Sequence, residues 1–299
     1  MKLPYDEMKH INGRDENPKR GLAKPERYDR VGIAQRRILI SKEPPYESVE
    51  VKAKEPNADP SLNPLDDVEL QSNGKLLTYE VGNPDDKDCK WATIWLHGAT
   101  PQRGDLGVID NIFGGAFNRM KHLAQENHGL YYSPYLNDFG SEDKVAISAL
   151  IKRIRTTTCP KGKIIVSCGS AGTSVCWDLA SDKDIVKDIS GLVLIGSAGG
   201  PNGNLKDTEA VKARIPILFA QGERDHPDYW KDLVSQLHRS DPDYPIRFVL
   251  YQSGGHMTPL RMLDWRETMN CMLTQAPEVS TSLDQNRGQS KEGAVKASQ

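Results

Sequence analysis

Short runs of apolar, often β-branched residues recur along the middle of the chain. They lie at residues 92–96, 163–166, 191–196, 215–220 and 246–251. Apolar runs of this length predict strands that are buried on both faces of a sheet. Helical patterns alternate with the runs, and such alternation predicts an α/β fold with a doubly wound, mainly parallel sheet and helices on both faces.

Other elements are predicted between these runs. Residues 116–126 form an amphipathic stretch, residues 130–132 an apolar strand, and residues 141–155 a helix. Ser141 is a candidate N-cap, with the acidic Glu142 and Asp143 favouring the positive end of that helix. Further strands are predicted at residues 68–70 and 76–81, and a further helix from Pro259 onward.

Composition divides the chain into three parts. Residues 1–66 are rich in charge and proline and lack periodicity, so we expect an N-terminal extension that is partly irregular, with an edge strand at residues 38–40. Residues 67–276 contain the alternating elements and form the expected globular domain. Residues 277–299 lack aromatic residues and are rich in Ser, Gln and Lys, which predicts a disordered tail.

Charge and cysteine content exclude several classes of function. The net charge is −2, so the sequence indicates neither a nucleic-acid partner nor an anionic membrane surface. Apolar runs are of strand length, which predicts no transmembrane segment, and residues 1–30 contain no apolar stretch typical of a signal peptide. The five cysteines lack metal-ligand spacing. We therefore expect a reduced, cytoplasmic setting, with Cys168 and Cys176 packing as small apolar groups.

The candidate chemistry begins at Ser170, in the segment Cys168-Gly169-Ser170-Ala171-Gly172. This segment follows a predicted buried strand and precedes a predicted helix. A serine at a strand-to-helix turn between small residues is typical of a nucleophile elbow, where the tight turn holds the hydroxyl above the sheet edge. The backbone N–H that follows lies at a helix N-terminus, where it can stabilise a developing oxyanion.

Two complementary residues follow in the order that this arrangement requires. Asp225 comes just after the predicted strand at 215–220, and His256 follows the strand at 246–251 in a glycine-rich loop. A serine hydroxyl needs an imidazole to accept its proton, and the imidazole needs a carboxylate to hold its tautomer. Glu223 and Asp228 are alternatives for the carboxylate, and Cys168 is an alternative nucleophile.

With these residues the chain resembles the α/β-hydrolases over residues 67–276. His97-Gly98 would stand in the family's oxyanion loop, with His97 structural, Ser170 in the elbow, Asp225 after the late strand and His256 in the final loop. The resemblance implies an oxyanion hole formed by the N–H groups of Ala99 (or Thr100) and Ala171. The elbow departs from the family pattern G-x-S-x-G, because Cys168 replaces the first glycine.

The resemblance also implies an activity. About 18 residues separate the strands at 191–196 and 215–220, too few for a large helical lid, so the site is similar to those of lidless carboxylesterases, thioesterases and dienelactone hydrolases. The expected function is hydrolysis of a small ester or thioester through an acyl-enzyme, which requires no metal or organic cofactor. Arg103 is a candidate for pairing with a substrate anion, and a solvated loop charge is the simpler interpretation. Alternative functions are a peptidase or acyltransferase, and a non-catalytic binding or scaffold protein.

Overall fold

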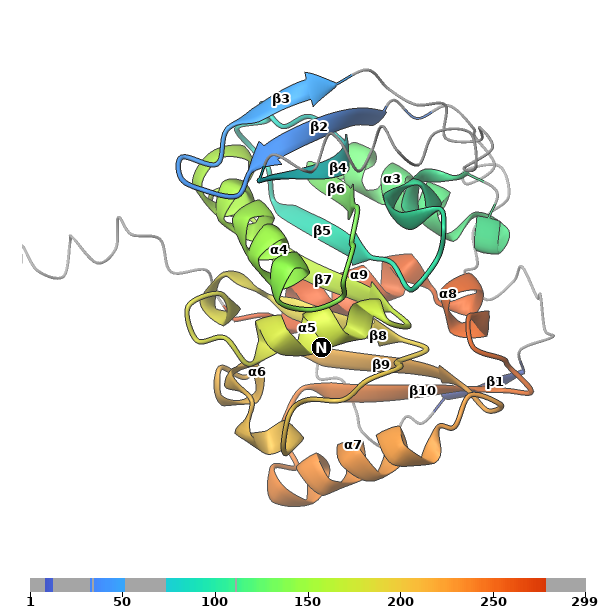
Figure 1. Ribbon diagram of the computed structural model, residues 1–299. Coiled ribbons are helices and arrows are strands. Elements are labelled where there is room, and N and C mark those ends of the chain that lie inside the picture. The colour runs from blue at the N-terminus through green and yellow to red at the C-terminus, as the bar shows by residue number, and fades with distance from the viewer. Residues whose placement is uncertain (1–8, 13–32, 34, 52–73, 111, 278–299) are drawn as a thin grey trace, which may run out of the picture.

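The computed structural model describes residues 9–12, 33, 35–51, 74–110 and 112–277. In this part of the chain, ten strands form one sheet in the order β1-β10-β9-β8-β7-β5-β6-β4-β2-β3 (Figure 1). The strands are β1 Lys9–Asn12, β2 Gln35–Ser41, β3 Ser48–Val51, β4 Lys75–Val81, β5 Trp91–Leu96, β6 Gly129–Pro134, β7 Lys163–Gly169, β8 Gly191–Ile195, β9 Ile217–Gly222 and β10 Ile246–Gln252.

Seven neighbouring strands, from β6 through β5 and β7–β10 to β1, are parallel, whereas β4, β2 and β3 pair antiparallel at one end of the sheet. The central strands are buried throughout, as their apolar sequences predict. The predicted class, a doubly wound and mainly parallel α/β sheet, is confirmed.

Helices cover both faces of the sheet. They are α3 Ala116–Glu126, α4 Ser141–Arg153, α5 Gly172–Ala180, α6 Glu209–Lys212, α7 Asp228–Ser240, α8 Thr258–Met262 and α9 Trp265–Gln275. Apolar side chains of α4, α5, α6 and α7 pack into one core, and those of α3, α8 and α9 pack into the other (Figure 1). Residues 196–216, between β8 and β9, contain only short helical turns, so no large lid is inserted there. None of the helices described is long and apolar enough to cross a membrane.

The N-terminal region contributes more to the sheet than its composition indicates. The strand expected at residues 38–40 is present as part of β2, but it lies between β3 and β4 rather than at the edge. Its side chains alternate between the two cores, with Ile38 and Ile40 in one and Leu39 in the other. At the opposite edge, β1 pairs with β10. The strand expected at residues 68–70 and all but the first residue of the tail expected at 277–299 lie outside the described residues.

Two sequence expectations are corrected. Cys168 and Cys176 do not pack as separate apolar groups but form a disulfide, and Cys89 forms another with Cys159. The predicted cytoplasmic setting is not tested by the structure. The two disulfides argue against it, because disulfides are typical of oxidising compartments. The N-cap of α4 is Gly140 rather than Ser141, and Asp143 satisfies the preceding turn by accepting three backbone N–H groups, those of Asn137, Asp138 and Phe139.

Candidate active site

Ser170 occupies a tight turn between β7 and α5. Its φ angle is +51°, a left-handed conformation that is uncommon for a residue other than glycine and that marks a strained turn. The Ser170 N–H donates to Ile195 O of the neighbouring strand at 3.0 Å. The turn is therefore anchored to the sheet, and it holds the serine just beyond the carboxyl end of β7, as the sequence predicts for a nucleophile elbow.

The elbow packs closely against the loop that follows β5. A methyl group at Gly98 would lie 2.7 Å from Ser170 Cβ, and one at Gly172 would lie 2.5 Å from His97 O. Separations this short exclude any side chain at either position without movement of the backbone. The small residues around the serine thus allow two segments, far apart in sequence, to place their backbones beside the same hydroxyl.

His256 lies between Ser170 and Asp225. Its Nε2 atom is 2.8 Å from Ser170 Oγ, and its Nδ1 atom is 2.8 Å from Asp225 Oδ2. Since a carboxylate can only accept, Nδ1 carries the proton and Nε2 is left to accept from the serine hydroxyl. This tautomer is the one in which an imidazole acts as a general base toward serine.

The geometry distinguishes Asp225 from the two alternative carboxylates. Glu223 accepts from the backbone N–H of Ser253 at 2.7 Å, so it stabilises the loop that carries the histidine. Asp228 is 90% exposed in the first turn of α7 and pairs with Lys231. Cys168, the alternative nucleophile, is buried and bonded to Cys176, so its sulfur is not a free thiolate.

His97 is fully buried and hydrogen-bonded on both sides of its ring. Its Nε2 accepts from Leu136 N at 2.9 Å, and its Nδ1 donates to Gly98 O at 2.7 Å. Burial lowers the pKa of His97 to about 4, so the ring is neutral at physiological pH. The ring therefore ties the start of the loop after β5 to the segment just after β6, and neither ring nitrogen is bonded to the serine.

Backbone donors flank the serine on both sides. In the part of the chain that the structure describes, the N–H groups of Ala99 and Ala171 have no hydrogen-bond acceptor. Ala171 is the N-cap of α5, at the positive end of the helix dipole, and Ala99 follows Gly98, whose backbone approaches the serine. The arrangement can present two N–H groups to a negatively charged oxygen.

Thr173 supports the turn at Ser170, although the sequence patterns described above did not single it out. Thr173 Oγ1 donates to Ser170 O at 2.6 Å and accepts from Ala198 N at 3.3 Å. It thereby joins the elbow to the loop after β8. Its signal was a threonine in the first turn of the helix that follows the serine, where such side chains bond nearby backbone groups.

The loops after β8 and after β5 each make side-chain hydrogen bonds within the protein. Trp177 Nε1 donates to Gly199 O at 2.7 Å, which secures the loop after β8. Arg103, the candidate for a substrate anion, donates to Asn137 Oδ1 at 3.0 Å. A partner within the protein favours the simpler interpretation of Arg103 as a loop charge.

Neither a protein-family model nor a curated protein sequence matches the chain. Solved structures similar to it include an esterase from Pyrococcus furiosus, at 14% identity and a TM-score of 0.49, covering 68% of this chain and 86% of that one. A truncated carbohydrate esterase from gut microbiota has 11% identity and a TM-score of 0.46, covering 66% and 90%. A dienelactone hydrolase from Anabaena variabilis has 13% identity and a TM-score of 0.40, covering 67% and 89%. These values are too low to transfer an activity, which is therefore inferred from the site.

Proposed function

We propose that the protein is a serine hydrolase that cleaves a small carboxylic ester or thioester through an acyl-enzyme on Ser170. The observation that carries the proposal is the continuous hydrogen-bonded chain from Ser170 through His256 to Asp225, with both distances at 2.8 Å. A nucleophile, a base and a group that orients the base are the three groups that triad catalysis by serine uses.

The acylation step uses these atoms as follows. Ser170 Oγ forms a bond to the substrate carbonyl carbon while its proton passes to His256 Nε2. The carbonyl oxygen becomes an oxyanion beside the N–H groups of Ala99 and Ala171, which gain their acceptor at that moment. The bond to the leaving oxygen or sulfur then breaks, and His256 returns the proton to the departing alcohol or thiol.

Deacylation repeats the sequence with water. Water gives a proton to His256 Nε2 while its oxygen attacks the acyl carbon, and the acyl bond to Ser170 Oγ breaks. The serine recovers the proton from the imidazole, and a carboxylic acid is released. Asp225 stays ionised throughout and stabilises the imidazolium that forms in each half of the reaction.

Labelling with a fluorescent fluorophosphonate tests the nucleophile directly. We expect the full-length protein to form a phosphonylated adduct, mapped by peptide mass spectrometry to Ser170, as fluoride leaves. The Ser170→Ala variant should not label. Ser174→Ala provides the matched control, because Ser174 lies in the first turn of α5, four residues after Ser170, and this variant should label as the wild type does. A folded wild type that fails to label would contradict the proposal and favour a non-catalytic binding protein.

A substrate panel then separates the enzyme classes that share an acyl-enzyme. We expect hydrolysis of p-nitrophenyl esters and acyl thioesters to exceed that of matched p-nitroanilides. Faster anilide cleavage would favour a peptidase, and faster transfer to an added alcohol than to water would favour an acyltransferase.

A further inference from the structure

A hollow lies at the amino ends of the parallel strands, whereas Ser170 lies at their carboxyl ends. It measures about 710 Å³, within the range of small-molecule sites. Its lining comes from the segments just before β5, β6 and β7 and from α3 and α9, and comprises Lys90, Trp91, Leu123, Glu126, Asn127, His128, Lys161, Lys163, Arg266, Met269, Asn270 and Leu273. Since β7 runs from Lys163 to Gly169, the length of a strand, roughly 20 Å, separates this hollow from the serine.

Positive charge is concentrated around this hollow. Lys90, Lys161, Lys163 and Arg266 line it against the single carboxylate of Glu126, a local excess of three positive charges in a chain whose net charge is −2. Within the described residues, the side chains of Lys161 and Arg266 have no hydrogen-bond or ion-pair partner. Like charges held together repel one another, and a bound anion would relieve that repulsion.

The cationic segments are held in place by covalent and backbone bonds. The Cys89–Cys159 disulfide joins the segment that carries Lys90 to the one that carries Lys161. Backbone bonds of 2.9 Å from Lys90 N to His128 O and 3.0 Å from Lys163 N to Lys90 O keep the three strand starts adjacent. A site whose charges are fixed before binding loses less entropy when a ligand arrives.

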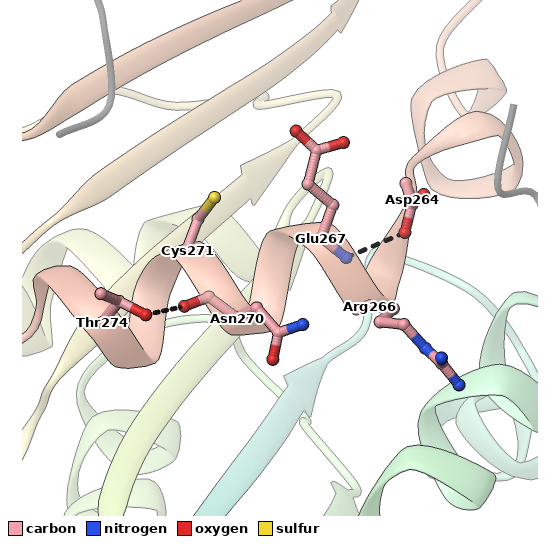
Figure 2. A pocket seen from close by; sticks show the side chains of 6 residues that line it. All are labelled: Asp264, Arg266, Glu267, Asn270, Cys271 and Thr274. Carbon is pink, nitrogen blue, oxygen red and sulfur yellow. Dashed lines mark hydrogen bonds between the residues drawn. The ribbon is translucent and has the colours of Figure 1, made fainter. Parts of the chain in front are cut away.

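Apolar side chains also line the hollow. Trp91, Leu123 and Met269 are buried members of one hydrophobic core, and the partly buried Leu273 packs against the same core. Figure 2 shows Arg266 and Asn270 projecting from the side of α9 opposite to Glu267 and Cys271. Both residues also line a smaller hollow of about 330 Å³ along this helix. The hollow thus combines apolar residues, which can contact the apolar part of a ligand, with cations, which can bind a negatively charged part.

We propose that this hollow binds an amphiphilic anion, a ligand with a carboxylate or phosphate headgroup and an apolar body. The headgroup would lie among Lys90, Lys161 and Arg266, and the body against Trp91 and Met269. The guanidinium of Arg266 can bind either headgroup in a bidentate manner. The site is separate from the proposed catalytic serine and does not depend on its activity.

Titration calorimetry with four octyl-chain ligands tests the proposal on the full-length, disulfide-bonded protein. Nonanoate, octyl phosphate, octanol and octyltrimethylammonium each carry an octyl chain and differ in the headgroup. We expect at least one anion to bind ten-fold or more tightly than octanol, and the cation to bind most weakly. Comparison of nonanoate with octyl phosphate identifies the preferred headgroup. Equal affinity for all four ligands would overturn the proposal.

Charge reversal locates the binding site. Lys161→Glu with Arg266→Glu should weaken anion binding at least ten-fold, whereas Lys206→Glu, an exposed lysine in the turn before α6, should leave it unchanged. Circular dichroism checks that each variant is folded. Anion binding that survives the double reversal but is blocked by fluorophosphonate on Ser170 would place the ligand beside Ser170 and reject this site. The Ser170→Ala protein should bind as the wild type does, which separates this test from that of the proposed hydrolase.

Discussion

The two sides of the candidate active site are built differently. On one side lies the early loop, residues 97–110 after β5, and on the other lie the late loops, residues 223–227 and 253–257 after β9 and β10. In the early loop, Asp105 is 7% exposed and accepts hydrogen bonds from the buried hydroxyls of Tyr79 and Tyr135. In the late loops, the side chains of His256 and Asp225 are 44% and 19% exposed.

The early loop should contribute mainly to the stability of the fold, and the late loops mainly to the proposed chemistry. Buried polar groups are costly to leave without partners, so the early loop is part of the folded core and its bonds contribute to the free energy of unfolding. The late loops are shaped by backbone bonds, such as Arg224 N to Gly254 O at 2.9 Å, and the side chains of His256 and Asp225 remain partly exposed. Substitutions in the two regions should therefore affect different measurements.

The largest expected effect belongs to the late loops. Asp225→Asn removes the charge that holds the His256 tautomer, and we expect kcat/KM for an ester to fall by about 10³- to 10⁴-fold. The free energy of unfolding, measured by urea denaturation, should change by less than about 0.5 kcal/mol, because the Asp225 side chain is partly exposed. Asp228→Asn is the matched control and should retain wild-type kinetics. Equal losses in the two variants would show that Asp225 has no special role.

The early loop should show the opposite behaviour. Asp105→Ala leaves two buried tyrosine hydroxyls without this acceptor, and we expect the free energy of unfolding to fall by about 3 kcal/mol. The cost should shrink when the same change is made in a Tyr79→Phe, Tyr135→Phe background, as a double-mutant cycle by urea denaturation would reveal. An undiminished cost in that background would mean that the tyrosines do not mediate the effect.

A smaller effect depends on pH. The pKa of His97 is lowered from 6.5 to about 4, so below pH 6.5 the unfolded chain takes up a proton that the folded protein does not. This group alone should make the protein less stable as pH falls, by about 2 kcal/mol at pH 5 relative to pH 7.5. Urea denaturation at both pH values, for wild type and His97→Gln, isolates the contribution. A pH dependence that is identical in the two proteins would contradict a buried, neutral His97.

Several features could be read from the sequence because they depend on local pattern. Fully apolar runs identified the central strands, and the position of Ser170 between a strand and a helix indicated the elbow whose φ angle is +51°. The order of Ser170, Asp225 and His256 placed all three just beyond strands. Parallel strands end at one edge of a sheet, so residues beyond them are brought together by topology alone.

Contacts between distant segments could not be read in the same way. Neither disulfide was anticipated, because the pairing of cysteines depends on which loops the fold brings together. The sequence favoured Asp225 and left Glu223 as an alternative. Both carboxylates follow β9, and only the tertiary structure shows that Asp225 faces His256 while Glu223 accepts from the Ser253 backbone.

The sequence by itself determined the class of fold, the order of the candidate catalytic residues and the small side chains around the serine, because these properties follow from periodicity and residue size. Tertiary structure alone decided that β2 lies inside the sheet and that His97 ties two loops together. It also brought together the cations around the hollow at the amino ends of the strands, which come from segments far apart in the chain. The physical reason is that hydrogen bonds and charge interactions act over a few ångströms in space, whatever the separation along the sequence.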